Sequence, residues 1–311
     1  MALTQTLTIK AQKPFDFDLS AQIFAGGDRQ VSVFADDSFS QVLNIGGKLM
    51  LVNITSKGTV DKPELTVELK SNSALSTGEK KRAEETINYI FNLKFPLSTF
   101  YEQAKADPIM VQITQKLYGL KNPTTPTVFE ALVDSIVEQQ ISIKVARTVE
   151  HRLAKKFGDQ LEIDGDTFFA FPTPQNIASA SIDEIQQVGL SRRKTEYIRE
   201  AALLIVADKL DLEHLKTHVK SEQIIAELDE IRGIGVWTAE LTMLRGMQKL
   251  DAFPADDFGI RRVISKYYCS GKAVDAGEAR EIAKAWGNWK GLAAYYLIIA
   301  EAKDLTVSLS G

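Results

Sequence analysis

The pattern of hydrophobic and polar positions changes near residue 96. Before that point, four segments alternate apolar and polar residues and contain many β-branched positions, namely residues 6–10, 30–36, 41–55 and 64–71. Such alternation is typical of half-buried strands, and turn signals rich in Gly and Asp separate the segments. Two further segments, 19–24 and 78–93, have helical character. Residues 1–96 are therefore predicted to form an α+β domain with an antiparallel β-sheet.

From residue 97 onward, apolar residues recur at spacings of three and four, as in helices that bury one face. One long repeat begins at residue 128 and ends at a stop signal, Gly158. Further helices are predicted at 174–179, 181–188, 193–207, 221–231, 236–247, 257–268, 276–286 and 290–301. Residues 97–311 are therefore predicted to form an all-helical domain, and the fold class of the whole chain is α+β.

Composition narrows the function without deciding it. The chain has 311 residues and is 44% hydrophobic. Its formal net charge of −4 counts mildly against a nucleic-acid binder but does not exclude one. A single cysteine, Cys269, rules out an intrachain disulfide and a four-cysteine cluster. The three histidines have no metal-ligand company in the sequence. The first residues do not resemble a signal peptide and no long apolar run exists, so we expect an intracellular protein without a membrane span.

Residues 230–239, E-I-R-G-I-G-V-W-T-A, place two glycines between two helical patterns. Glycines at positions 233 and 235 are expected to allow a tight turn with positive φ and to remove side chains that would block an approaching backbone. The N–H groups of Gly233, Gly235, Val236 and Thr238 would then bind a DNA phosphate at a helix start. For a bare G-x-G pattern, an ordinary turn between helices is the simpler interpretation.

The longer pattern L-x-x-I-x-G-I-G-x-W-T-A resembles the helix-hairpin-helix motif. Asp257 lies twenty residues past Trp237 and five before Arg262, and with this spacing the region resembles the helix-hairpin-helix–GPD superfamily of DNA glycosylases. The resemblance implies that Asp257 is the catalytic carboxylate, which stabilises positive charge on the sugar and orients water. Helix capping by Asp256 or Asp257 is the alternative, and Asp256 is expected to be a cap or a neighbour.

The resemblance also implies a branch of the family and a cation. Bifunctional members carry a lysine two residues after the second hairpin glycine, where this chain has Trp237, and iron–sulfur members need four cysteines. What remains is similar to the alkylation-repair branch, the DNA-3-methyladenine glycosylase II type. No cofactor is then expected, apart from a monovalent cation at the carbonyls of Ile231 and Gly233.

Residues 129–132 and 136–142 match the F-E-x-L and I-x-x-Q-Q-x-S segments of that branch. By this match, Gln140 would fill the gap left by a flipped base and Gln139 would support the loop, although a polar helix end would give the same residues. Residues 189–194 match a G-L-S-x-x-K loop, in which Arg192, with Arg193 and Lys194, would contact the DNA backbone. A solvated charged face is the simpler interpretation of such a charge run.

Aromatic residues are expected to line the pocket for the flipped base. Trp237 and Trp289 match aromatic pocket positions of the family, and Phe24, or a neighbour such as Phe17, would close the pocket from the N-terminal domain. Aromatics at helical spacing are more often core residues, and Trp286 is expected to be one. Leu241 stands where the family usually has a tyrosine, which puts the range of lesions in doubt.

The leading hypothesis is a monofunctional DNA glycosylase of base excision repair that removes bases of the 3-methyladenine and 7-methylguanine type. Its active site would lie between two helical lobes. Its partner would be damaged double-stranded DNA, without a membrane, and it would act as a monomer in the cytoplasm or nucleoid. Alternatives are a glycosylase for hypoxanthine or an oxidised purine, and a non-catalytic hairpin protein in which Asp257 has no role.

Overall fold

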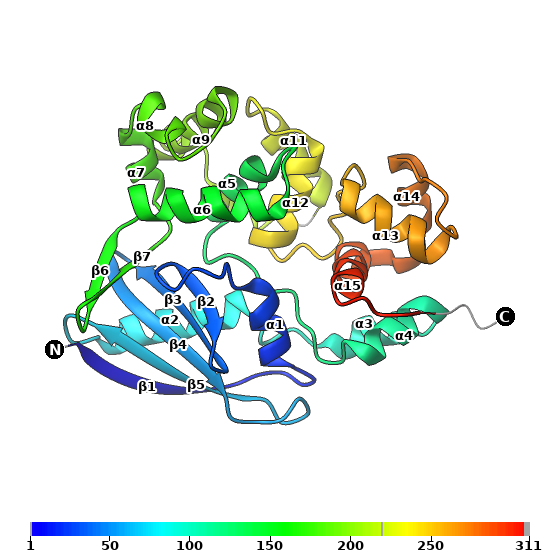
Figure 1. Cartoon of the computed structure of the whole chain (residues 1–311), viewed down its shortest axis with the longest axis horizontal. Helices are drawn as coiled ribbons and strands as arrows, with labels where there is room; N and C mark the ends of the chain where they lie inside the picture. Colours follow the sequence, from blue (N-terminus) through cyan, green and yellow to red (C-terminus); the bar gives the residue numbers. More distant parts are fainter. Residues whose placement is uncertain (1, 219, 308–311) are drawn as a thin grey trace.

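The computed structural model describes residues 2–218 and 220–307. Its N-terminal part is a five-stranded sheet in the order β1-β5-β4-β3-β2, and each neighbouring pair is antiparallel. The strands are β1 (Leu3–Lys10), β2 (Ser32–Ala35), β3 (Ser38–Ile45), β4 (Lys48–Ser56) and β5 (Glu64–Ser71). In Figure 1 this sheet lies at the lower left, below the helices α5 to α9, which lie between residues 128 and 206. The predicted antiparallel sheet is confirmed.

Two helices complete this part of the molecule, α1 (Phe17–Phe24) and α2 (Thr77–Ile90). The alternation along β4 sends Met50, Val52 and Ile54 into the core shared with both helices, as strand geometry requires. A capping box between Ser76 and Glu79 starts α2. This buried cluster extends to Leu93, and the cluster of the helical part begins at Leu97.

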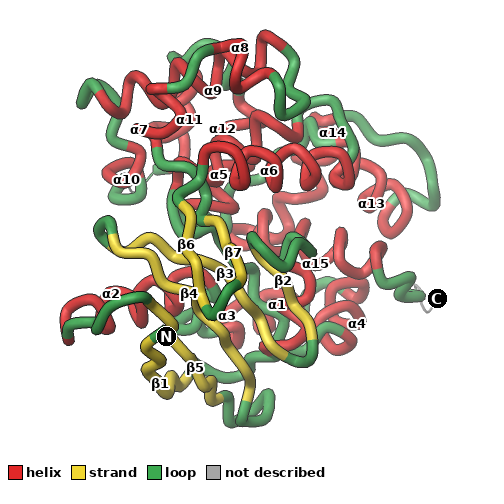
Figure 2. The backbone as a smooth tube through the Cα atoms, turned by 60° about the vertical axis from the view of Figure 1, so that its left-hand side comes forward, coloured by secondary structure: helices red, strands yellow, loops and turns green. Residues whose placement is uncertain are grey.

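The all-helical prediction for residues 97–311 is wrong at one place, because β6 (Gln160–Ile163) and β7 (Asp166–Phe169) form a hairpin. Asp164 and Gly165 both have positive φ in the tight turn between them, a turn chemistry that favours hairpins and was missed. Leu161 and Ile163 pack on Val42 and Leu51, on the other face of the sheet. The hairpin therefore joins the helical part to the N-terminal sheet (Figure 2).

The remaining elements are helices. They are α3 (Leu97–Ala104), α4 (Pro108–Lys116), α5 (Val128–Glu138), α6 (Ile143–Phe157), α7 (Pro174–Ser179), α8 (Ile182–Gln186), α9 (Arg192–Val206), α10 (Leu212–Leu215), α11 (Ser221–Asp229), α12 (Val236–Gly246), α13 (Phe258–Tyr268), α14 (Ala276–Ala283), the 3₁₀ helix η1 (Lys284–Trp289) and α15 (Lys290–Ala302). The sequence pattern did not predict α3, α4 and α10. In Figure 1, α5 to α12 form one group, and α13 to α15 lie beside α3 and α4.

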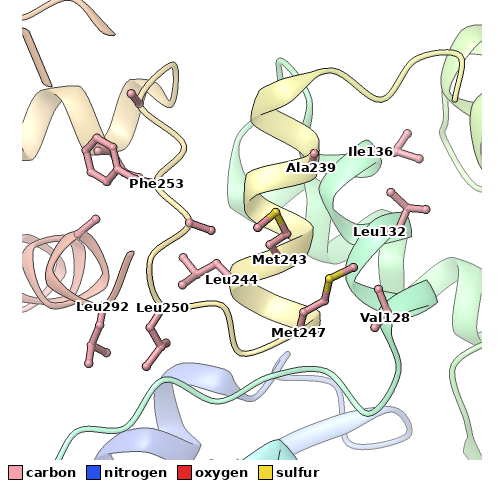
Figure 3. Close-up of a cluster of buried hydrophobic side chains, with 14 of the residues drawn as sticks. Val128, Leu132, Ile136, Ala239, Met243, Leu244, Met247, Leu250, Phe253 and Leu292 are labelled. Atoms are coloured by element: carbon pink, nitrogen blue, oxygen red, sulfur yellow. The ribbon is translucent and has the colours of Figure 1, made fainter. Parts of the chain in front are cut away.

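Helix α12 is the central element of the helical part. Figure 3 shows Met243 and Met247 directed toward Val128 and Leu132 of α5, while Leu244 points toward the segment that leads to α13. All five side chains are buried. Since α12 follows the glycine hairpin and contacts both groups of helices, it fixes the hairpin in the fold.

The long repeat predicted over residues 128–158 is two helices rather than one. The helical conformation ends after α5, where Gln140 has a φ of 57°. Ser142 then caps the start of α6. The apolar spacing continues across the break because both helices bury one face, so periodicity alone did not reveal it. Among the helices of residues 2–218 and 220–307, none has the length and apolar character needed to cross a membrane.

Candidate active site and DNA-binding elements

Asp257 is held by two N–H groups from different elements. It is the N-cap of α13, where its Oδ1 accepts a hydrogen bond from the backbone N–H of Ile260 at 2.9 Å. Its Oδ2 accepts from the indole N–H of Trp237 at 3.2 Å. The predicted spacing of twenty residues therefore brings these two side chains into direct contact. The helix capping considered as the alternative role of Asp257 is therefore present, whereas Asp256 is exposed and is a neighbour of the cap rather than the cap itself.

The segment that carries Asp257 is fixed by an ion pair between a buried carboxylate and a partly exposed guanidinium. Glu240 of α12 is 4% exposed, and both its oxygens accept from the guanidinium of Arg280 on α14 at 2.9 and 3.1 Å. The same guanidinium donates to the carbonyl of Phe253 at 3.1 Å. Burial raises the pKa of Glu240, whereas Arg280 opposes that rise. The ion pair thus ties the loop before Asp257 to the helix that carries Trp237.

The two hairpin glycines differ. Gly233 has a φ of 86°, as predicted, and a Cβ built there would lie 2.2 Å from the ring of Tyr197 on α9. Gly235 has φ −93° and ψ −179°, so the prediction of positive φ is wrong for this residue. In the described part of the chain, apart from Gly235 and its immediate neighbours in the chain, no atom lies within 4 Å of where its Cβ would be. Neither the backbone nor the packing of the protein requires glycine at position 235.

Gly235 is the N-cap of α12, and among the described residues no side chain caps this helix. The side chain of Val236 is 41% exposed beside it. Thr238 is buried, and its Oγ1 accepts from the Nε2 of Gln139 at 3.0 Å, so its side chain faces the protein and its contact with DNA stays a prediction. The first turn of α12 therefore presents uncapped N–H groups next to open space.

The predicted gap-filling segment lies against this hairpin. The Nε2 of Gln139 also donates to the carbonyl of Gly233 at 3.0 Å, which agrees with a supporting role for Gln139. Gln140 is exposed, in the left-handed conformation. Lys194 turns inward and donates from Nζ to the carbonyls of Val137 and Gln139, so its amine is engaged within the protein, and its contact with the DNA backbone stays a prediction.

Arg192 lies at the start of α9 and is exposed. Its Nε donates to Glu196 at 3.2 Å, and the same carboxylate accepts from Arg232 of the hairpin at 3.2 Å. The guanidinium of Arg232 also lies over the ring of Tyr197, 5.5 Å from its centroid. Two arginines thus converge beside the hairpin, although each is paired with Glu196.

The rings of the other two predicted pocket residues, Trp289 and Phe24, pack on phenylalanine rings. Trp289 packs on Phe95 and Phe100, with ring centroids 5.5 and 6.5 Å away. Phe24 packs on Phe39 and Phe91 in the N-terminal core. Their roles in base binding stay predictions. Trp286 is 3% exposed and donates its indole N–H to Asp107, which confirms it as a core residue.

The carbonyls predicted to hold a cation are both hydrogen bonded. The carbonyl of Ile231 accepts from the N–H of Ile234, and that of Gly233 accepts from Gln139. Each carbonyl oxygen retains a second lone pair. Both oxygens can therefore still act as ligands of a monovalent cation. Within residues 2–218 and 220–307, no group of three His, Cys, Asp or Glu side chains is arranged to hold a metal ion.

Sequence reasoning missed several residues that position the site. Arg280 lies forty residues from Glu240 in the chain, and Tyr197 lies far from Gly233. Neither pair has a local pattern that could have revealed it. The polarity of Glu240 within the apolar run of α12 is a signal that could have pointed to a buried partner.

The family model described as HhH-GPD superfamily base excision DNA repair protein matches residues 133–288, which include the hairpin and Asp257. A protein from Bacillus subtilis (strain 168), named DNA-3-methyladenine glycosylase, is 33% identical over 223 residues, which are 70% of this chain and 73% of that protein.

Solved structures give the same fold. The 3-methyladenine DNA-glycosylase from Archaeoglobus fulgidus is similar with a TM-score of 0.84 and 27% identity, over 95% of this chain and 98% of that one. An 8-oxoguanine glycosylase/lyase of Clostridium acetobutylicum, solved with double-stranded DNA, has a TM-score of 0.77 over 98% and 99% of the two chains. At 19% identity, the second likeness concerns the fold alone.

Proposed function

The chain belongs to the HhH-GPD superfamily of base excision DNA repair proteins, and we propose that it is a monofunctional DNA glycosylase for alkylated bases. It would remove bases of the 3-methyladenine and 7-methylguanine type from double-stranded DNA and leave an abasic site. The names of the relatives from Bacillus subtilis and Archaeoglobus fulgidus support this substrate class. The observation that carries the proposal is the carboxylate of Asp257, held between Ile260 and Trp237 beside the glycine hairpin.

Asp257 would supply the charge that the reaction requires. Breaking an N-glycosidic bond develops positive charge on the deoxyribose, and a fixed carboxylate stabilises that charge in the transition state. The two N–H donors orient the carboxylate, and each oxygen keeps lone pairs for a water molecule or the sugar. An alkylated purine already carries positive charge and leaves without a strong general acid. One carboxylate can therefore suffice.

Lyase activity would need an amine that reaches the sugar. The hairpin position of such a lysine holds Trp237, whose indole cannot form an imine. Burial lowers the pKa of Lys121 to about 7. A large fraction of this amine is therefore unprotonated at neutral pH, which is the form that acts as a nucleophile. However, Lys121 is fully buried and donates to the carbonyls of Asn92 and Leu93, both at 3.0 Å. Its amine cannot reach DNA in this fold, which supports the monofunctional proposal.

DNA would be held mainly by backbone groups. The uncapped N–H groups at Gly235 and Val236 would bind a phosphate, helped by the dipole of α12. A monovalent cation on the carbonyls of Ile231 and Gly233 would add positive charge at the same place. Arg192 would exchange Glu196 for a phosphate. This mode of binding needs little net positive charge and is compatible with the net charge of −4.

The damaged nucleotide would leave the duplex and stack on Trp237, with Trp289 and Phe24 as further pocket residues. Gln140, exposed and in the left-handed conformation, would occupy the vacated space. The protein would act as a monomer, because flipping one base needs one copy, and would be found with the cellular DNA.

The test is release of free base from DNA treated with a methylating agent, with strand breaks scored before and after hot alkali. The proposal predicts release of 3-methyladenine or 7-methylguanine and breaks that depend on alkali. Breaks without alkali would contradict the monofunctional mechanism. Release of hypoxanthine or an oxidised purine in place of methylated bases would move the assignment to another lesion.

A further inference from the structure

The first turns of α9 contact both loops that the proposed function brings to DNA. Lys194 donates from Nζ to the carbonyl of Val137 at 2.8 Å and to that of Gln139 at 2.5 Å. Within the next three residues, Glu196 binds Arg232 of the hairpin, and the ring of Tyr197 lies directly under Gly233. One short helical segment is thus the common support of the gap-filling loop and the phosphate-binding hairpin.

The contacts of Lys194 have a clear physical origin. The last carbonyls of a helix lack partners within the helix, and a cation there also favours the helix dipole. At the C-terminal end of α5, Lys194 supplies hydrogen-bond donors for the carbonyls and a positive charge for the helix dipole. Burial lowers the pKa of Lys194, so holding this amine away from solvent is unfavourable by itself. The two short hydrogen bonds offset that loss.

The contacts continue from Lys194 to the hairpin through a single residue. Gln139 accepts from Lys194 with its backbone carbonyl and donates with its side chain to Gly233 and Thr238. The next residue, Gln140, is held in the left-handed conformation that non-glycine residues rarely adopt. The direction of the Gln140 side chain therefore depends on how the carbonyl of Gln139 is held.

We propose that Lys194 is a positioning residue that fixes Gln140 relative to the hairpin, so that gap filling and phosphate binding occur together. The inference rests on the proposed function. It assigns Lys194 to the step in which the damaged base leaves the duplex, not to the chemistry at Asp257. Without the amine, Gln140 loses its fixed direction while the hairpin and Asp257 stay in place.

The experiment uses a substrate for which that step is easy. Turning out a base costs less when the base is mismatched than when it is paired. Lys194→Met keeps the length of the side chain but removes its donors. With a methylated base in a paired duplex, we expect kcat to fall about tenfold or more, because both hydrogen bonds from the charged amine are lost. KM should stay within about threefold.

With the same methylated base in a mismatched duplex, the loss should shrink to about threefold or less. Lys194→Arg, which restores a charged donor, should recover most of the activity on the paired duplex. Gln140→Ala should show the same dependence on pairing, and the double variant with Lys194→Met should lose little more than either alone. Lys81→Met is a matched control, since it removes an exposed lysine on α2 that is 3.9 Å from Glu85.

Equal loss of activity on both duplexes, or a loss that follows a lowered melting temperature, would overturn the positioning role. A purely structural contact lowers activity on every substrate alike. If the wild-type protein releases no base from either duplex, the proposed function itself fails, which is a different outcome from failure of the Lys194 inference.

Discussion

Gly235→Ala is expected to weaken DNA binding without weakening the fold. The residue has φ −93° and ψ −179°, which alanine adopts freely, and within the described chain, apart from Gly235 and its immediate neighbours, nothing lies within 4 Å of the new methyl group. Replacing glycine contributes about 0.4–1 kcal/mol of stability through the unfolded state, which offsets the lower preference for alanine than for glycine at an N-cap. The methyl group would instead occupy the space before the uncapped N–H groups of α12. Losing one charge-assisted hydrogen bond to phosphate costs roughly 1.5–3 kcal/mol, or about 10- to 150-fold in Kd.

Gly233→Ala is the matched contrast, because it should weaken the fold. Its φ of 86° is unfavourable for alanine, and the added Cβ would lie 2.2 Å from the rigid ring of Tyr197. Strain and overpacking of this kind each cost about 1–3 kcal/mol. Fluorescence anisotropy with a duplex that carries an uncleavable abasic analogue measures Kd, and thermal unfolding measures stability. If Gly235→Ala binds DNA within twofold of the wild type, a backbone approach at this glycine is refuted.

Three further predictions concern the site and the core. Trp237→Phe keeps a ring but removes the N–H that binds Asp257, and kcat should fall about tenfold or more with DNA binding retained; an unchanged kcat would show that this hydrogen bond does not orient the carboxylate. Arg280→Ala leaves the buried Glu240 without its partner and should lower the free energy of unfolding by about 3 kcal/mol, whereas Glu240→Gln should be milder; equal losses in urea titrations would contradict the argument. Burial and the charge of Glu150 raise the pKa of Glu130 to about 8, compared with the ordinary pKa of 4.5 for this side chain. Between these two pH values, the carboxyl group is protonated in the folded state and ionised in the unfolded state. Stability from this group is thus fully present below pH 4.5 and is lost as the pH rises to about 8, and Glu130→Gln should raise the melting temperature at pH 9 relative to pH 5; parallel shifts at both pH values would refute this sign.

Most of the architecture was predictable because local patterns carry it. Period-two alternation identified the strands, and period-three-and-four spacing identified most of the longer helices. The failures have specific causes. The helices α5 and α6 share one apolar spacing across the break at Gln140. The hairpin of β6 and β7 depends on the two-residue turn at Asp164, in a region where helical signals surround it.

The candidate site was predictable only where its residues lie on one short segment. Trp237 and Asp257 are twenty residues apart in the sequence, a separation that the family motif specifies. The structure brings the two side chains into contact. The supports of the site come from residues far apart in the chain, such as Lys194 with Gln139 and Arg280 with Glu240. Such pairs depend on tertiary packing, which a single sequence does not encode in any local pattern.

The most direct test of the central claim compares Asp257→Asn with Asp256→Asn in single-turnover release of methylated bases, with Kd measured on the same duplex. Both variants remove one negative charge from neighbouring residues, so their effects on DNA affinity through net charge should be similar. Asparagine is also a good N-cap, so Asp257→Asn should keep the start of α13. We predict that Asp257→Asn binds DNA at least as well as the wild type but releases base at least about a hundredfold more slowly, as expected when fixed charge stabilisation of the transition state is lost. Asp256→Asn should stay close to wild-type activity. Base release by Asp257→Asn at the wild-type rate would contradict the assignment of Asp257 as the catalytic residue.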